Sequence, residues 1–180
     1  MQHFRGFSSI VAVKDPDGQS MPPWEAAERG WFPVGRVPDH VKLGIDEVPL
    51  ACNMQLDNFR QYMAYAMTFR NPVNNYVLQR FGVGTGLLAP TASDVQLGNQ
   101  IPLVATDNPL YNTKLFDSVS YQSPFQTIIN FTLGVNDAVG YLITEMGLYS
   151  GDQTLLVKWL LPAGIQGGVS SLTFQHRLVW

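Results

Sequence analysis

The chain has 180 residues and a mass of 20.0 kDa, a size that suits one domain and can bury a core without disulfides or metals. Only 14% of the residues are charged, against about 25% in ordinary domains, so the sequence predicts a folded protein with a charge-poor surface. The net charge of -3 provides no cationic field for phosphates, which argues against a nucleic-acid partner.

Cysteine and histidine are too sparse for the common metal and redox sites. Cys52 is the single cysteine, which excludes an intrachain disulfide and a thiolate zinc site. His3, His40 and His176 are scattered, and we expect His176 to be packed on the apolar face of a strand. No apolar run is long enough to span a bilayer and the start lacks a signal-peptide core, so no membrane association is expected.

The first part of the chain is rich in proline, which interrupts helices because it lacks the amide hydrogen. We predict an extended N-terminal arm over residues 1–53. Within it, a short helix should run from Pro23 through Arg29, with Gly30 in the left-handed conformation after its end. Asp15-Pro16-Asp17-Gly18 is typical of a tight turn.

The second predicted unit covers residues 54–180. Apolar residues at helical spacing predict one amphipathic helix over 57–69. Beyond Asn75 the period changes to two, most clearly over 127–133 and 172–180, where apolar and polar residues alternate. The predicted fold class is therefore mainly β, an antiparallel β-sandwich or open barrel with one helix and a long proline-rich arm.

A β-hairpin is predicted around Ser150-Gly151-Asp152-Gln153, with Gly151-Asp152 at the centre of a two-residue turn. Counting outwards from this turn places Leu148 opposite Leu155 and Glu145 opposite Lys158. The two leucines would then share one face, and the two charges would pair on the other.

No pattern in the sequence predicts catalysis, a cofactor or a metal ion. The glycine-rich run Phe81–Gly86 has neither the spacing of a dinucleotide-binding loop nor the lysine of a P-loop, and it is typical of a strand end. No linked nucleophile, base and oxyanion donor is present, so we expect a protein that is not an enzyme.

Two segments resemble small structural proteins of tailed bacteriophages. They are residues 81–97, FGVGTGLLAPTASDVQL, and residues 143–162, ITEMGLYSGDQTLLVKWLLP. Similar hairpin sequences occur in phage tail-fibre and tail-collar proteins. The resemblance covers roughly the C-terminal hundred residues. It departs from the pattern at Lys158-Trp159 and at Pro162-Ala163-Gly164, and no repetitive shaft follows, which favours a compact accessory subunit over a receptor-binding fibre.

The resemblance implies a non-enzymatic virion subunit, made in the host bacterial cytoplasm. Its partners would be copies of itself and portal, neck, tail or capsid subunits, at the neck, collar or tail. We expect the arm to contact neighbours through Trp24, Trp31 and Phe32. The alternatives are a capsid decoration protein, or a carbohydrate-binding module for host recognition that uses Trp24, Trp31, Trp159 and Trp180 as a stacking platform.

Overall fold

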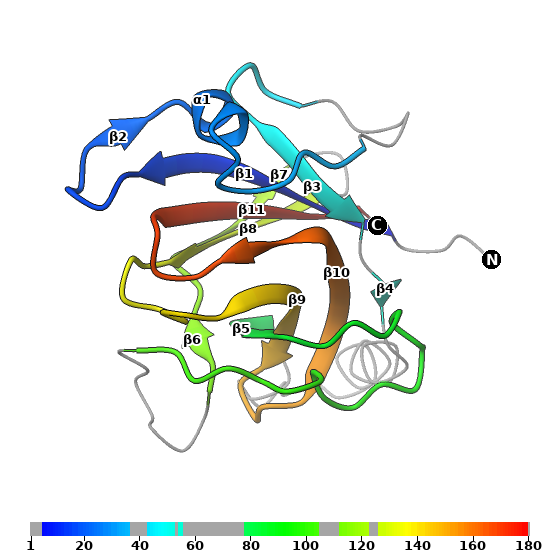
Figure 1. The fold of residues 1–180 in the computed structure, drawn as a ribbon. Coiled ribbons are helices and arrows are strands. Elements are labelled where there is room, and N and C mark those ends of the chain that lie inside the picture. The colour runs from blue at the N-terminus through cyan, green and yellow to red at the C-terminus, as the bar shows by residue number, and fades with distance from the viewer. Residues whose placement is uncertain are drawn as a thin grey trace.

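The computed structural model describes residues 5–36, 43–52, 54–55, 78–104, 112–122 and 126–179. These residues form one short helix, α1 (Pro23–Glu28), and a set of strands that makes up two antiparallel sheets (Figure 1). The strands are β1 (Arg5–Lys14), β2 (Ser20–Met21), β3 (Val48–Cys52), β4 (Met54–Gln55), β5 (Leu78–Gly84), β6 (Lys114–Leu115), β7 (Ser118–Gln122), β8 (Gln126–Leu133), β9 (Leu142–Ser150), β10 (Leu155–Gln166) and β11 (Ser171–Val179). The prediction of a mainly β fold is confirmed.

The first sheet has the strand order β2-β1-β11-β8-β7, with β3 also paired to β1, and the second has the order β4-β10-β9-β5-β6. The two sheets share one hydrophobic core. Phe81 of the second sheet meets Phe131 of the first with ring centroids 4.7 Å apart, and Phe131 stacks on Phe174 at 5.2 Å. The alternation of β8 and β11 explains this contact, because Phe131 and Phe174 oppose each other and project to the same face.

The proposed N-terminal arm is not confirmed. β1 lies inside the first sheet, paired with β11 along its length and with β2 and β3 on its other edge. Its side chains Phe7, Ile10 and Val13 are buried. The proline-rich segment therefore supplies a strand to the core. Pro16 lies in the turn after β1, and Pro49 lies within β3, opposite Ser9 of β1. The division of the chain at residue 53 stays a prediction.

The helix predicted over Pro23–Arg29 is confirmed, since α1 begins at Pro23 and Gly30 has φ +78. The turn at Asp15–Gly18 is also present, with the Gly18 amide donating to the Asp15 carbonyl at 3.0 Å. The amphipathic helix predicted over 57–69 lies outside the described residues.

The predicted register of the β9–β10 hairpin is wrong. The Gln153 amide donates to the Ser150 carbonyl at 3.1 Å, and Gln153 itself has φ +68, so the loop contains three residues. Local side-chain bonds favour this loop, because the Thr154 amide donates to Ser150 Oγ at 3.1 Å and to Asp152 Oδ1 at 3.3 Å. The longer loop shifts the pairs by one residue, and an irregularity between Leu155 and Val157 shifts those beyond it by one more.

In the observed register Leu155 lies opposite Tyr149, and Val157 lies opposite Leu148. Leu148 therefore belongs to the main core, while Leu155 lies in a separate cluster with Tyr149 and Leu97. The predicted shared face for Leu148 and Leu155 is wrong for this reason.

β10 continues beyond Pro162 to Gln166. Leu160 lies opposite Glu145 and Ile165 lies opposite Ile143, so a bulge occupies residues 161–164. Pro162 has no amide hydrogen for the ladder, and Gly164 adopts φ +71, which explains why the bulge falls there.

Candidate functional site

A long loop covers the outer face of the second sheet, and its two ends are hydrogen-bonded to each other. It comprises residues 85–99, which we call the anchored loop. The Thr85 amide donates to the Asn99 carbonyl at 3.3 Å, and Gly84 forms an isolated bridge with Gln100. A loop of this length whose ends meet is an Ω-loop, a form often used for function. In Figure 1 it is the green segment between β5 and β6.

The anchored loop holds large apolar side chains in solvent. The exposed fractions are 77% for Leu87, 83% for Leu88 and 70% for Val95. Single exposed apolar residues are ordinary, but three of them on one loop are a typical feature of an interaction surface. Sequence reasoning missed these three residues, although all of them lie in the quoted segment 81–97. The sequence signal that could have indicated their exposure is their position in a stretch rich in glycine and proline.

Beneath the loop, three charged side chains form a buried ion cluster. The Lys158 ammonium nitrogen lies 3.0 Å from Asp94 Oδ2 and 3.2 Å from Glu145 Oε2. The side chains of Glu145, Lys158 and Asp94 are 0%, 7% and 21% exposed. Glu145 and Lys158 were predicted to lie directly opposite each other, but Lys158 faces Gly147 and reaches Glu145 diagonally across the two strands. The pair is also buried.

Glycines make room for the buried carboxylate. A Cβ atom at Gly86 would lie 2.5 Å from Glu145 Oε1, and one at Gly84 would lie equally close, at 2.5 Å. A Cβ at Gly98 would lie 3.4 Å from the same oxygen. Gly84 and Gly86 of the run Phe81–Gly86 are therefore needed because Glu145 occupies the space that their side chains would fill.

Hydrogen bonds join the loop to β9 at the same point. The Gly86 amide donates to Glu145 Oε1 at 3.1 Å, and the Thr144 hydroxyl donates to the Gly86 carbonyl at 2.8 Å. This amide, which an anion-binding loop would offer to a ligand, is thus satisfied by the protein's own carboxylate. The run was predicted to be a strand end, and β5 does end within it, at Gly84.

The ionisation of the cluster follows from its contacts. Burial opposes the charge on Asp94, but hydrogen bonds from Thr91 and Lys158 outweigh it and lower the pKa of this carboxyl. Burial likewise disfavours charge on Lys158, yet its bonds to Asp94 and Glu145 raise its pKa. Burial and the negative charge of Glu145 raise the pKa of the Tyr149 phenol. Asp94 and Lys158 are therefore held in their charged forms, which binds the loop to the sheet.

The predicted assembly contacts lie on α1 and just after it, where α1 packs against β1 and β3 of the first sheet, and they differ in accessibility. Phe32 is 4% exposed and belongs to the main core, and Trp31 packs against that core. Trp24 is 43% exposed on α1. Trp159 is fully buried in the core, so it cannot join an exposed platform for sugars. Trp180 lies outside the described residues.

His176 is buried and packed, as predicted. Its Nδ1 lies 2.7 Å from Ser8 Oγ, and its ring stacks on Trp159 with centroids 5.1 Å apart. Burial lowers the pKa of His176 to about 3, so this side chain is neutral at ordinary pH.

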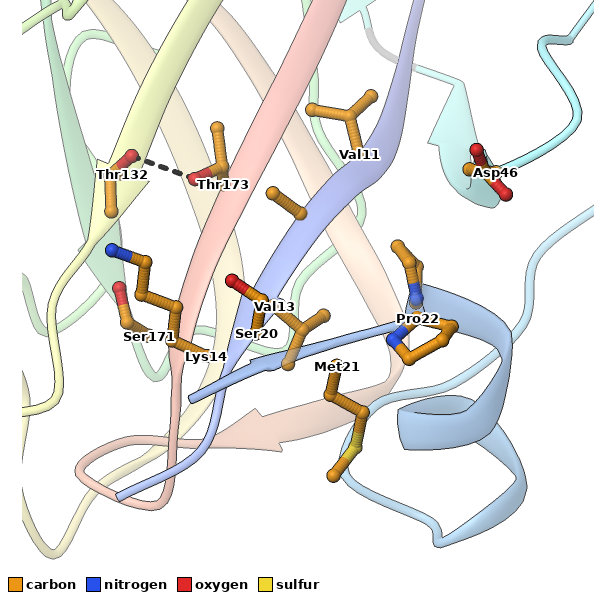
Figure 2. Close-up of a pocket in the computed structure, with 12 residues that line it drawn as sticks. Val11, Val13, Lys14, Ser20, Met21, Pro22, Asp46, Thr132, Ser171 and Thr173 are labelled. Carbon is orange, nitrogen blue, oxygen red and sulfur yellow. Dashed lines mark hydrogen bonds between the residues drawn. The ribbon is translucent and has the colours of Figure 1, made fainter. Parts of the chain in front are cut away.

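A groove of about 530 Å³ lies against β1, β2 and the start of β11 (Figure 2). Hydroxyls line one part of it, and the Thr132 and Thr173 hydroxyls are 3.0 Å apart. Figure 2 shows the Lys14 amine on this side and the Asp46 carboxylate on the other. Within the described residues, no group of three or more histidine, cysteine or acidic side chains is placed to hold a metal ion.

Among the described helices, none is long and apolar enough to cross a bilayer. Comparison of the chain with protein-family models, with curated proteins and with solved structures finds no match. The function must therefore be argued from the chain's own residues.

Proposed function

We propose that the chain is a non-enzymatic structural subunit of a tailed-bacteriophage virion, and that it docks to neighbouring virion proteins through the anchored loop. The observation that carries the proposal is the exposure of Leu87, Leu88 and Val95 on a loop whose base is fixed by a buried ion cluster. A loop that is already ordered loses little conformational entropy on binding, so its apolar side chains can contribute more of their burial to affinity.

The phage resemblance and the cluster depend on the same residues. One segment, 81–97, supplies the glycines, Asp94 and the exposed leucines, and the other, 143–162, supplies Glu145 and Lys158. The resemblance therefore has a physical interpretation, in which both segments are needed to build and hold one docking loop. This argument favours the loop over the N-terminal arm as the main contact, with Trp24 as an exposed additional contact.

The charge-poor composition also supports an assembly role, because permanent interfaces are relatively apolar. Placement at the neck, collar or tail is the preferred location, and a capsid decoration role is the alternative. Both locations use the same loop chemistry, and the site of labelling on the particle distinguishes them.

The test is incorporation into particles. In lysates of cells that produce the virus, the chain should sediment with particles, and an antibody against it should label a defined position in electron micrographs. The double variant Leu87→Ser/Leu88→Ser should fold normally and lose incorporation. Ile45→Ser, at a side chain 95% exposed in another loop, is the matched control and should incorporate normally.

Two results would count against the proposal. Sedimentation of the chain away from particles would remove the virion role. Normal incorporation of the double leucine variant would leave the virion role in place but exclude the anchored loop as the docking surface.

A further inference from the structure

Strand β7 forms one end of the first sheet. It pairs with β8, and no other described strand pairs with its outer edge (Figure 1). Its five residues, Ser118-Val119-Ser120-Tyr121-Gln122, are all exposed and carry no charge. Its outward backbone amides and carbonyls thus form an open hydrogen-bonding edge.

The core-facing side of β7 is apolar but uncovered. Ser118 lies on the outer face, where its hydroxyl accepts a bond from the Asn130 amide at 3.0 Å. Val119 lies opposite the buried Ile129 and Tyr121 lies two residues further along, so both project to the core-facing side. They nevertheless remain 55% and 68% exposed, respectively. The apolar face of the first sheet therefore extends past the point where the second sheet covers it.

Natural edge strands are usually protected by lysine, proline, an inward charge or a bulge. β7 has none of these features, and its pairing with β8 has no register shift. An edge that is both open and apolar is suited to adding a strand from another chain.

We propose that the partner strand is β7 of a second copy, paired antiparallel about a twofold axis at Ser120. In this register Val119 lies opposite Tyr121 of the second copy, and Ser118 lies opposite its Gln122. Because β7 carries no charge, two copies meet without repulsion. In this register even-numbered residues oppose even-numbered residues and odd oppose odd, so the outward amides and carbonyls of the two strands can pair. The apolar side chains of both copies then form one continuous strip.

The contact should be weak by itself. Five paired residues per chain bury less than the roughly 1,200 Å² of a standard stable interface. Such a contact matters when other contacts hold the copies together, because linked sites raise the effective concentration. The inference depends on β7 alone and is independent of the anchored loop.

The test is disulfide trapping in a Cys52→Ala background, which removes the native thiol. Ser120→Cys places two thiols at the axis, where antiparallel Cα atoms are about 4.5–5.5 Å apart and a disulfide can form. Gln122→Cys is the matched control on the same strand. Its two copies would be on the order of 14 Å apart, beyond the reach of a disulfide.

Under mild oxidation at high protein concentration, Ser120→Cys should form a covalent dimer at least tenfold faster than Gln122→Cys. Adding Val119→Lys, which places a charge on the apolar strip of each copy, should slow the Ser120→Cys reaction at least tenfold. Equal rates for the two cysteine variants, or no dimer from either, would overturn the proposal. Incorporation of the leucine variants is a separate measurement, so failure here leaves the proposed function intact.

Discussion

Replacing Lys158 by methionine tests whether the ion cluster holds the anchored loop. Methionine has a similar length and no charge, so the change removes the cation and keeps much of the packing. Glu145, which is fully buried, would then have lost the cation beside it. Asp94 would also lose its contact with the sheet.

The size of the effect follows from the burial of each partner. Removing one member of a buried ion pair costs about 3–5 kcal/mol, because the remaining charge stays out of water. Asp94 is 21% exposed and keeps part of its hydration, which favours the lower end, about 3 kcal/mol. For a chain of this length that loss corresponds to a fall in Tm of about 6–12 °C.

The assay is urea unfolding of the wild type, Lys158→Met and the double variant Glu145→Gln/Lys158→Met. The double variant also removes the Glu145 carboxylate that has lost its cation, so its unfolding free energy should be at least about 1 kcal/mol higher than that of Lys158→Met. Arg29→Met is the control, because Arg29 pairs with Glu25 on the surface with half of its side chain exposed, and it should cost less than about 0.5 kcal/mol. A Lys158→Met effect no larger than this control, or no recovery in the double variant, would refute the reasoning.

Three further predictions follow from the same structure. Gly86→Ala places a Cβ 2.5 Å from the Glu145 carboxylate and should lower the unfolding free energy by about 1–3 kcal/mol, whereas Gly44→Ala, whose Cβ would lie 3.1 Å from Glu47 Oε1, should cost less; equal losses in thermal melts would contradict this. Leu87→Ser/Leu88→Ser should change the unfolding free energy by less than about 0.5 kcal/mol, and a larger loss would show that these leucines support the fold. His176 has a pKa lowered to about 3, so below pH 6.5 the unfolded chain binds a proton that the folded chain does not, and stability is lost as the pH falls. His176→Phe removes this effect, so the wild type should lose about 2 kcal/mol more than the variant between pH 7 and pH 5, and an equal loss in both would exclude it.

Local patterns predicted the parts of the fold that depend on local chemistry. The alternation of β8 and β11, the helix that begins at Pro23 and the packed His176 follow from side-chain period and proline geometry, and the structure contains all three. The hairpin was located correctly, but its register was not, because Ser150 and Asp152 bond to the Thr154 amide and extend the loop by one residue.

The role of the N-terminal segment could not be predicted, because it depends on contacts far away in the chain. β1 pairs with β11, about 170 residues later, and proline content alone does not reveal such a partner. Phe32 was expected on a surface for the same reason, yet it fills the main core.

The sequence by itself determined that the chain is charge-poor and mainly β, and that the run Phe81–Gly86 is rich in glycine, since these properties depend on composition and short-range spacing. Only the tertiary structure decided that Gly84 and Gly86 lie against Glu145 and that Asp94, 51 residues before Glu145, completes the ion cluster. Side chains this far apart in sequence meet only when strands pair and a loop folds over them, so no local pattern specifies their contact.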